Sequence, residues 1–563
     1  MPGGAVPAFT GTSSGPVIKP KSARETVPAI AVAAFAAFGG ILFGYDTGTI
    51  SGVIAADEFR KDFGTYYPYN RPDNDLTINP PKAGYALDTA TKSLFVSILS
   101  AGTFFGALAG APLADILGRR WGLQVAMVVF CLGVALQVGT APHQDALFVV
   151  GRVFAGLGVG IVSSIVPMYQ SETAPRWIRG AVVSGYQWAI TIGLLIAAIV
   201  NNSTNGRSDT GSYRIPIAVQ FAFAIIMSVG LFFLPESPRW YVKKGKPEMA
   251  AKSLAFLNST DVDDPVVRSE LADIQTNLDT ELTYGTGSYR DCFRNNDRKY
   301  LYRTLTGTWL QAWQQLTGIN FIFYYGTTFF QSTGQSDPFV FTVISNVVNV
   351  VTTVPGMFMM ERVGRRKLLI WGALWMFLCE LIVAILGTTA STGNHGAQKA
   401  LVALVCLYVA GFASTWGPAA WVVCGEIFPL AIRAKALSLC TASNWLWNFG
   451  IGYATPYLVD TGAGKAGLQT KVFFIWAGTC FCCAIFAYFC IVETAGLSLE
   501  EVDELYSQVT PRQSGRANRE LRANRSDLET NAFTGAPVLM KEDEEVSADY
   551  VKEDMVKTAQ ADA

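Results

Sequence analysis

The segment GYDTGTISG, residues 44–52, places the carboxylate of Asp46 inside an otherwise apolar stretch. A charged side chain near the middle of a membrane helix costs about 2.5–3.5 kcal/mol on insertion scales, so Asp46 should face water or a charged partner. Arg152 is the candidate partner. At about 1.5 Å of rise per residue, Asp46 lies roughly 15 Å and Arg152 roughly 10 Å from the outer ends of their predicted spans, so the two side chains lie at similar depths in the membrane. The two residues therefore predict an ion pair between two helices.

Carboxamide side chains form a second group, in and just before the segment QQLTGIN. Gln311, Gln314 and Gln315 stand at positions i, i+3 and i+4, so an unbroken helix presents all three on one face. Asn320 would then point nearly the opposite way, and its use in the same site requires a helix break, which costs least at Gly318. Carboxamides both donate and accept hydrogen bonds, which suits a neutral ligand with several hydroxyl groups. The alternative is that they bond only to neighbouring helices.

Acids and arginines recur at fixed spacing in two parts of the chain. ADILGRR (114–120) and MERVGRR (360–366) each hold an acid four residues before an arginine, and SETAPRWIRG (171–180) and GEIFPLAIRA (425–434) each hold them seven apart. If the motifs held only basic residues, they could serve simply to orient the chain in the membrane. Acids at a fixed spacing from the arginines favour a second explanation, namely salt bridges that form when the ends of the helices come together. The predicted gating residues are Asp115, Arg119, Glu172, Arg179, Glu361, Arg365, Glu426 and Arg433.

Composition excludes several classes of protein. Half of the 563 residues are hydrophobic and only 15% are charged, with a mean hydropathy of +0.29, which indicates a membrane protein. A net charge of −1 argues against nucleic acid as a partner. With only two histidines, the chain is unlike a histidine-dependent enzyme or a protein with a metal or cofactor site. The absence of a G-x-x-x-x-G-K-[ST] string argues against an ATP-driven pump. Nine of the ten cysteines fall in apolar stretches, where we expect them to pack as apolar side chains.

Apolar stretches long enough to cross a bilayer core of about 30 Å occur twelve times, six on each side of a polar linker. They predict an all-α membrane protein. The N-terminal tail lacks the regions of a signal peptide, so we expect the first stretch to be retained as a span. The predicted spans are residues 29–54, 94–114, 121–141, 146–167, 181–201, 215–234, 304–331, 338–360, 367–388, 399–424, 434–459 and 470–492.

The charged motifs of the two halves lie 246 and 254 positions apart, so each half is one copy of a six-helix unit. Two parallel six-helix repeats around a central site describe the major facilitator architecture, in which the halves rock about a substrate. The expected parts are a disordered N-terminal tail (1–28), an N-terminal bundle (29–235), a helical linker (236–303), a C-terminal bundle (304–492) and a largely disordered C-terminal tail (493–563).

The positions of lysine and arginine predict the orientation of the chain. They gather in the loops after even-numbered spans, as in Arg119 and Arg120, whereas the loops after spans three and seven hold none. Both termini and the linker are therefore expected in the cytoplasm.

Over residues 30–505 the chain resembles the sugar porter family of the major facilitator superfamily, and most of all the fungal high-affinity hexose transporters. Two departures from the family pattern are Val492, where proline often stands, and Ala419-Ala420, where some animal members have Ile-Pro. The segments that carry the resemblance are GYDTGTISG, LGRRWG, GRVFAGLGVG, PMYQSETAPRWIRG, PESPRW, QQLTGINFIFYYG, ERVGRR, GPAAWVVCGEIFP and ETAGLSLEEVDEL.

The resemblance implies a site for a hexose, with glucose as the first candidate. An uncharged sugar presents hydroxyl groups that both donate and accept, together with a C–H face that packs on an aromatic ring, so carboxamides and a tryptophan suit it. The implied sugar-binding residues are Gln187, Gln314, Gln315, Asn320, Asn349, Trp421 and Asn444.

In proton-coupled members of the family, the residues that match Asp46 and Arg152 form the proton switch. The resemblance implies that protonation of Asp46 releases Arg152 and raises sugar affinity, so that H⁺ and sugar cross together. A permanent ion pair in a proton-independent uniporter is the alternative. A sugar receptor of transporter type is a further one, although such receptors usually carry a longer tail. We therefore expect a monomeric plasma-membrane symporter without catalytic residues, metal or cofactor.

Overall fold

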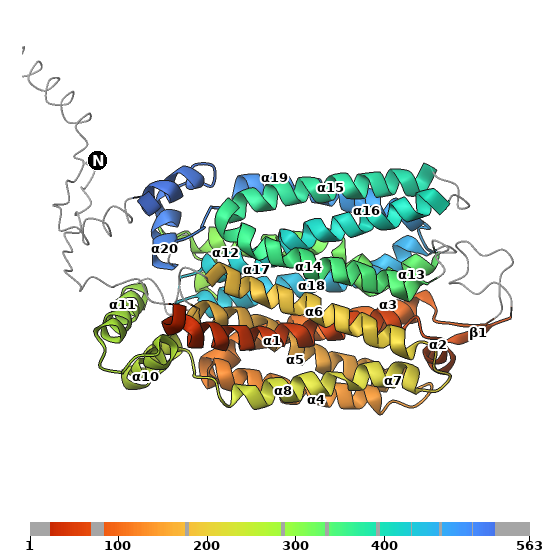
Figure 1. The fold of residues 1–563 in the computed structure, drawn as a ribbon, viewed down its shortest axis with the longest axis horizontal. Helices are drawn as coiled ribbons and strands as arrows, with labels where there is room; N and C mark the ends of the chain where they lie inside the picture. The colour runs from red at the N-terminus through yellow and green to blue at the C-terminus, as the bar shows by residue number, and fades with distance from the viewer. Residues whose placement is uncertain are drawn as a thin grey trace, which may run out of the picture. The chain divides into compact units, whose positions relative to one another are not determined.

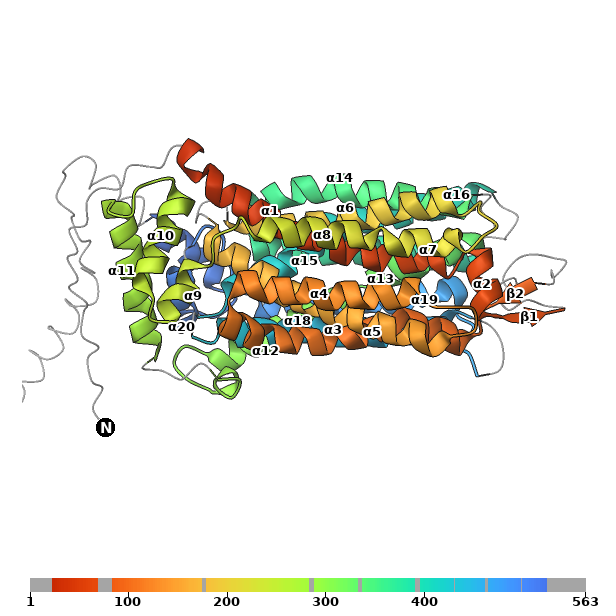
Figure 2. The same cartoon turned by 90° about the horizontal axis from the view of Figure 1, so that it is seen from below.

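The computed structural model describes residues 23–68, 84–174, 179–282, 288–332, 337–389, 395–429, 431–460, 464–497 and 499–523. The architecture below is that of the compact unit formed by residues 20–518. Its long helices run side by side (Figures 1 and 2), and short elements pack at the two ends of the bundle.

One end carries a two-stranded antiparallel hairpin of β1 (Thr65–Tyr67) and β2 (Gly84–Ala86), and it is called the hairpin end. The opposite end carries α9 (Pro238–Lys243), α10 (Pro247–Asn258) and α11 (Pro265–Leu282), and it is called the linker end. The helices at the linker end connect the N-terminal half of the bundle to the C-terminal half.

Six long helical stretches make up the N-terminal half, and the short α2 follows the first of them. The elements are α1 (Ala23–Val53), α2 (Asp57–Phe63), α3 (Thr89–Leu117), α4 (Arg119–Val138), α5 (Asp145–Thr173), α6 (Arg179–Thr204), α7 (Gly211–Ala218) and α8 (Gln220–Leu231).

The C-terminal half repeats this plan with two interrupted stretches, and α20 follows it at the linker end. The elements are η3 (Asp291–Phe293), α12 (Tyr300–Leu316), α13 (Ile319–Ser332), α14 (Pro338–Val363), α15 (Arg365–Thr389), α16 (His395–Ser414), α17 (Trp416–Glu426), α18 (Arg433–Val459), η4 (Gln469–Lys471), α19 (Val472–Cys490) and α20 (Leu499–Gln508).

Helices occupy all twelve predicted spans, but within the described residues only ten stretches are long and apolar enough to cross a bilayer by composition. The two exceptions have a physical cause. The seventh span is broken into α12 and α13, and the eleventh, α18, carries buried polar residues such as Asn444 and Asn448. Both spans line the interior of the bundle, where polar side chains replace apolar ones.

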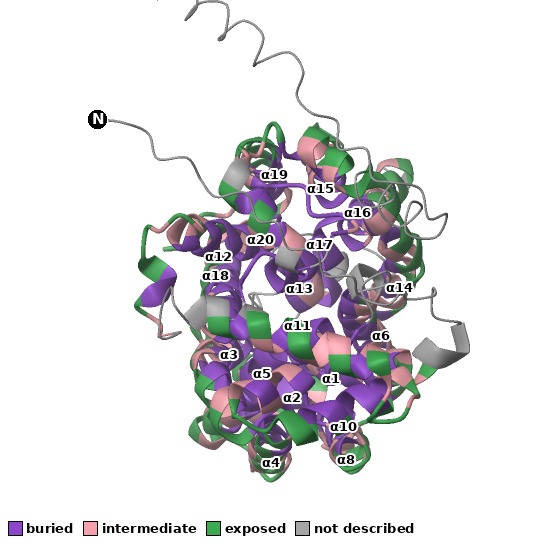
Figure 3. Cartoon of the chain, turned by 90° about the vertical axis from the view of Figure 1, so that its left-hand side faces the viewer, coloured by how far each residue is buried: buried purple, intermediate pink, exposed green. Residues whose placement is uncertain are grey.

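Burial follows the pattern of a protein whose solvent is lipid (Figure 3). Large apolar side chains lie on the outside, with Phe233 78% and Val128 71% exposed, whereas carboxamides such as Gln311 and Asn349 are fully buried. Polar groups find no partner in hydrocarbon and therefore turn inward. The chain is an all-α membrane protein of two six-helix halves joined by a helical linker.

The glycines of GRVFAGLGVG let α3 and α5 cross at close range. A Cβ on Gly156 would lie 2.3 Å from the carbonyl oxygen of Leu99, and a Cβ on Gly160 would lie 2.2 Å from that of Thr103. No side chain fits between these backbones. The motif therefore serves helix packing.

The helix break expected at Gly318 is present. The helix α12 ends at Leu316 and α13 begins at Ile319, with Gly318 between them at φ +83°, a left-handed conformation that glycine adopts at little cost. The ring of Trp476 packs directly against this glycine, because a Cβ there would lie 2.5 Å from Trp476 Cγ. Both the backbone angle and the available space require glycine.

We expect Gly318→Ala to lower the thermal unfolding temperature of the purified protein. The left-handed backbone alone costs about 1–2 kcal/mol in a residue with a Cβ, and the contact with Trp476 adds to it. Gly478→Ala is the matched control, because a Cβ at that position on α19 meets no atom within 4 Å. Equal unfolding temperatures in the two variants would contradict the role given to the break.

Candidate functional site

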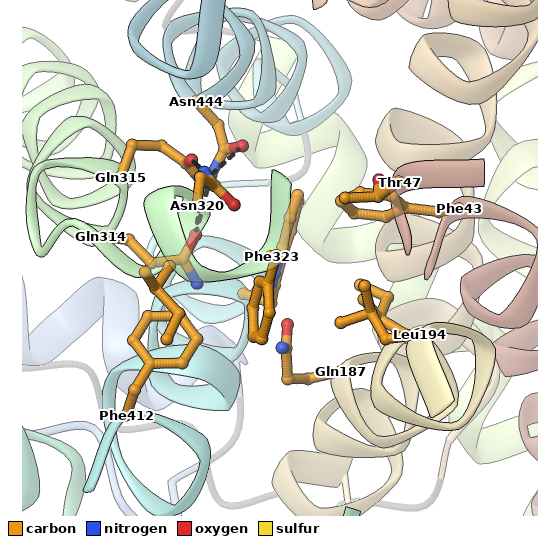
Figure 4. A pocket seen from close by; sticks show the side chains of 13 residues that line it. Phe43, Thr47, Gln187, Leu194, Gln314, Gln315, Asn320, Phe323, Phe412 and Asn444 are labelled. Atoms are coloured by element: carbon orange, nitrogen blue, oxygen red, sulfur yellow. Dashed lines mark hydrogen bonds between the residues drawn. The ribbon is translucent and has the colours of Figure 1, made fainter. Parts of the chain in front are cut away.

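A cavity lies between the two halves, about midway along the bundle. Its volume is about 40 Å³, which is room for a few water molecules. Four carboxamides of the C-terminal half gather on one side of it, and Phe43, Thr47, Leu194 and Gln187 of the N-terminal half lie on the other, with Phe323 between (Figure 4). The lining residues are Phe43, Thr47, Gln187, Ile190, Leu194, Gln314, Gln315, Ile319, Asn320, Phe323, Phe412, Trp421 and Asn444.

The three glutamines of α12 share one face, as their spacing predicts, and meet Asn444 of α18. Asn444 Nδ2 donates to Gln311 Oε1 at 2.7 Å and to Gln314 Oε1 at 2.8 Å, and Gln315 Nε2 donates to Asn444 Oδ1 at 3.0 Å. Gln314 Nε2 in turn donates to the carbonyl of Gly417 at 2.8 Å. These four carboxamides thus form a network in which donors and acceptors are fixed.

The break at Gly318 brings Asn320 into this network. Asn320 Nδ2 donates to Gln315 Oε1, although Asn320 lies beyond the break and an unbroken helix would turn it away. Asn448 Nδ2 donates to the same oxygen at 3.1 Å. The sequence reasoning missed Asn448, whose signal was its place four residues after Asn444 on the same helix face.

The structure brings six of the seven predicted sugar-binding residues to the cavity, and Asn349 is the exception. Trp421 and Gln187 line the cavity from α17 and α6, and the Trp421 ring meets Tyr186 edge to face at 5.5 Å. Asn349 lies on α14, fully buried, and neither its side-chain nitrogen nor its oxygen has a hydrogen-bond partner in the described part of the chain. An unpaired buried carboxamide costs free energy, which a ligand that reached it would recover.

Asp46 and Arg152 lie against each other between α1 and α5. Asp46 Oδ1 is 3.4 Å from Arg152 Nη1, and both side chains are almost completely buried. The pair is incompletely satisfied, because Asp46 Oδ2 and Arg152 Nη2 have no hydrogen-bond partner among the described residues. Arg152 Nε donates to the carbonyl of Phe95 at 3.2 Å. Thr47, the residue after Asp46, lines the cavity, whereas Asp46 and Arg152 are not among its lining residues.

A chain of hydrogen bonds connects the surroundings of this pair to the carboxamides. The hydroxyl of Tyr324, which lies within electrostatic reach of Arg152, donates to Asn448 Oδ1 at 2.7 Å. Asn448 then donates to Gln315. Ser100 of the N-terminal half also donates to Asn448 Oδ1, at 2.6 Å. Asn448 therefore contacts both halves, and it joins the carboxamides to Tyr324, which lies near Arg152.

The predicted charged residues form pairs within each half at the linker end. In the N-terminal half, Arg119 Nη2 lies 2.8 Å from Glu172 Oε1 and Arg119 Nη1 lies 3.9 Å from Asp115 Oδ1. In the C-terminal half, Arg365 lies 2.8 Å from both Glu361 and Glu426. The two sets have the same arrangement, as the repeat predicts.

The two remaining arginines of the predicted set behave differently. The side chain of Arg179 lies outside the described residues. Arg433 donates through Nε to the carbonyl of Phe428 at 3.0 Å, and it is close enough to Glu172 of the other half to interact electrostatically.

Lysines that the sequence reasoning missed complete the linker end. Asp115 Oδ2 accepts from Lys435 of α18 at 2.5 Å, and Asp115 Oδ1 accepts from Lys243 of α9 at 3.1 Å. The first of these ion pairs joins the two halves directly. In the sequence, Lys435 directly follows the motif GEIFPLAIRA (425–434) and has no counterpart in the first half, where Ala181 stands at the matching position.

Two glutamates outside the predicted set cap the repeated motifs. Glu236 accepts from the backbone N–H groups of Arg119 and Arg120 at 2.9 and 3.0 Å, and Glu493 accepts from those of Arg365 and Arg366 at 2.9 and 3.2 Å. A carboxylate at a helix N-terminus satisfies free N–H groups and the helix dipole. The sequence held a signal for both: Glu236 lies in the segment PES and Glu493 in the similar segment VET, and each segment stands at the end of one half.

The halves are also joined at the hairpin end. Lys92 Nζ on α3 lies 3.0 Å from the Asp460 carboxylate at the end of α18, and the Thr89 hydroxyl donates to the same carboxylate at 2.9 Å. Ser51 and Thr327 form a further hydrogen bond of 3.2 Å between α1 and α13. The cavity is thus bridged on both of its sides.

Comparisons with known proteins place these features in a family. The family model described as "Sugar (and other) transporter" matches residues 32–506. The probable glucose transporter rco-3 of Neurospora crassa is 44% identical over 86% of this chain and 80% of its own. The high glucose sensor RGT2 of Saccharomyces cerevisiae is 42% identical over 87% of this chain and 62% of its own.

A solved structure shares the whole architecture. The proton:xylose symporter XylE, from E. coli, bound to 6-bromo-6-deoxy-D-glucose, is 27% identical, with a TM-score of 0.71 over 86% of this chain and 100% of that one. The matches span both halves and the linker between them. This chain therefore belongs to the sugar (and other) transporter family of the major facilitator superfamily, whose members are transporters rather than enzymes.

Proposed function

We propose that this chain carries a hexose, with glucose as the first candidate, into the cell together with a proton. The two halves alternate in opening toward either side of the plasma membrane, with the linker end in the cytoplasm. The observation that carries the proposal is a buried Asp46–Arg152 pair near Tyr324, whose hydroxyl is hydrogen-bonded through Asn448 to the carboxamides of the cavity.

The lining of the cavity supports a neutral, polyhydroxylated substrate. The lining residues include carboxamides, aromatic rings and aliphatic side chains, and none of them is charged. A sugar hydroxyl replaces a carboxamide partner at little cost, because it both donates and accepts, whereas a charged substrate would lack a counter-ion. The name of rco-3 as a probable glucose transporter favours glucose among the hexoses.

The buried ion pair supports proton coupling. When Asp46 is ionised, its attraction holds Arg152 and offsets part of the cost of burying both charges. When Asp46 binds a proton, that attraction is lost and Arg152 is free to move relative to Tyr324. The change reaches Asn448 and Gln315, so protonation and sugar binding affect the same network.

The bridges on both sides of the cavity support alternating access. The Asp115–Lys435 pair joins the halves at the linker end, and the Lys92–Asp460 pair joins them at the hairpin end. Opening of either end breaks the pair on that side and leaves the other in place. Each open state is therefore stabilised by the pair on the opposite side.

The relative RGT2 raises the alternative of a sugar receptor. RGT2 is named a high glucose sensor, whereas rco-3, at 44% identity, is named a probable glucose transporter. A proton-independent uniporter with a permanent Asp46–Arg152 pair is the other alternative. Uptake measurements separate all three functions.

The decisive experiment compares wild type with Asp46→Asn in cells that lack their own hexose carriers. We expect wild type to accumulate labelled glucose above its external concentration, and a protonophore to abolish the accumulation. Asp46→Asn should lose accumulation but still exchange labelled for unlabelled glucose across the membrane. The reason is that asparagine mimics a protonated Asp46 that can neither bind nor release a proton.

Asp209→Asn is the control for this experiment, since Asp209 forms an exposed ion pair with Arg207 outside the membrane-spanning helices. Its accumulation should match that of wild type. Uptake by wild type that only equilibrates and ignores the protonophore would identify a uniporter. A wild type that moves no sugar would identify a receptor.

We expect Gln314→Ala to raise the KM for glucose uptake about tenfold. A hydrogen bond between neutral groups contributes about 0.5–1.5 kcal/mol, and 1.4 kcal/mol corresponds to a factor of ten in affinity. The control is Gln124→Ala, which removes a buried carboxamide that bonds to Ser228 between α4 and α8, away from the cavity. A similar KM in the two variants would argue against a sugar contact at Gln314.

We expect Lys435→Gln to loosen the linker end. Loss of the ion pair with Asp115 removes a direct bridge between the halves, so backbone amides in the facing turns of α3 and α18 should exchange hydrogen for deuterium several-fold faster. Lys244→Gln serves as the control, because Lys244 is exposed and stacks only on Trp240. Unchanged exchange in Lys435→Gln would show that this pair does not hold the halves together.

A further inference from the structure

A carboxyl group outside the substrate site lies deep in the C-terminal half. Glu380 on α15 is 1% exposed, and neither of its oxygens has a hydrogen-bond partner of good geometry within the described part of the chain. No described lysine, arginine or histidine forms an ion pair with it. A carboxylate in this position would carry an uncompensated charge inside the membrane, so Glu380 must be neutral or reach a partner nearby.

Two polar groups lie next to Glu380. The Tyr408 hydroxyl of α16 and the Cys480 thiol of α19 face its carboxyl group. The other titratable groups close to it are the thiols of Cys379 and Cys483. All of these groups are neutral, and none supplies a positive charge to a carboxylate.

The hydrogen of Tyr408 is already used. The Tyr408 hydroxyl donates to the carbonyl oxygen of Thr317 at 2.7 Å, at the break between α12 and α13. A hydroxyl has one hydrogen, so a group that approaches the oxygen of Tyr408 from another side must donate to it. Glu380 donates only in its protonated form. An ionised Glu380 would instead compete with Thr317 for the Tyr408 hydrogen.

We propose that Glu380 is a positioning residue for the helix break, acting as a protonated acid that donates to Tyr408 and thereby fixes the Tyr408 hydrogen on the Thr317 carbonyl. The proton of Glu380 stays on its carboxyl group throughout, so no group is transferred. The chain runs from Glu380 through Tyr408 to Thr317, next to the left-handed Gly318.

The consequence for transport follows from the position of Thr317. Gln314 and Gln315 precede the break and Asn320 follows it, so the geometry at Thr317 sets how these carboxamides meet. Loss of the hydrogen bond to Thr317 lets α13 shift relative to α12. Sugar affinity therefore falls, while the number of folded transporters stays the same.

The test compares the KM of glucose uptake in three variants of the full chain, and it rests on the proposed hexose transport. Glu380→Gln remains neutral and able to donate, so its KM should stay within about twofold of wild type. Glu380→Met has a similar size but no donor, and Tyr408→Phe removes only the hydroxyl. Both should raise the KM about tenfold, the change expected for one hydrogen bond.

The double variant Glu380→Met/Tyr408→Phe should have the KM of Tyr408→Phe alone, because both changes break one chain. A purely structural role for Glu380 predicts that Met, which suits a lipid-buried core, leaves the KM unchanged, and that result overturns the inference. A KM raised as much by Gln as by Met also overturns it. If Glu380→Met is not recovered as folded protein, Tyr408→Phe decides, and an unchanged KM in that variant refutes the inference.

Failure of the proposed function is recognised separately, because wild type then takes up no glucose. In that case the thermal unfolding of the purified variants gives the answer without a sugar. Glu380→Gln should unfold at the wild-type temperature and Tyr408→Phe at a lower one. Equal unfolding temperatures of Tyr408→Phe and wild type overturn the inference.

Discussion

The break between α12 and α13 is the constraint on which the candidate site depends. Interrupting a helix inside a membrane leaves backbone carbonyls without partners, and lipid supplies none. Here the Thr479 hydroxyl donates to the Leu316 carbonyl at 2.6 Å and the Tyr408 hydroxyl donates to the Thr317 carbonyl at 2.7 Å. Side chains of α19 and α16 thus stabilise a break that a lone helix would not sustain. The break in turn places carboxamides from both sides of it in one network.

The two halves are built alike, but they contribute different chemistry. Each has an arginine held by acids at the linker end and a glutamate that caps the helix carrying that arginine. This shared frame holds the ends of the helices. The cavity receives its carboxamide network from the C-terminal half, whereas the buried Asp46–Arg152 pair belongs to the N-terminal half. A single repeat therefore supplies one part of the function only, and the interface between the halves combines the parts.

Sequence patterns predicted those features that depend on spacing along one chain segment. The helical spacing of the three glutamines, the break at Gly318 and the duplicated acid–arginine motifs are local, and the structure contains all of them. Among contacts between segments far apart in sequence, the Asp46–Arg152 pair was predicted from the depths of the two residues in their spans, but others were missed. Lys435 pairs with Asp115 across 320 positions, and that pairing depends on how the halves dock.

Single residues show the same limit of sequence reasoning. The family resemblance implied Asn349 as a sugar-binding residue, and it lies fully buried on α14 but outside the cavity lining. Whether Asn349 reaches the cavity depends on the distance between α14 and the cavity. That distance cannot be predicted from the spacing of residues within α14. Asn448 was overlooked although it lies one helical turn from Asn444, because its importance comes from contacts with Ser100 and Tyr324 on other helices.

Coupling between two sites requires that each site bias the same structural element. Asn448 meets this requirement, because one oxygen accepts from Ser100 of the N-terminal half and from Tyr324 of the C-terminal half, while its nitrogen donates to Gln315. In the proposed transport cycle, rocking of the halves would move Ser100 away from Asn448, and a shift of Arg152 would change the surroundings of Tyr324. Binding free energies are reciprocal, so if proton binding at Asp46 strengthens sugar binding, sugar strengthens proton binding by the same factor. A symporter and a uniporter therefore share this architecture, and they differ in whether the two charge states of Asp46 place Tyr324 differently.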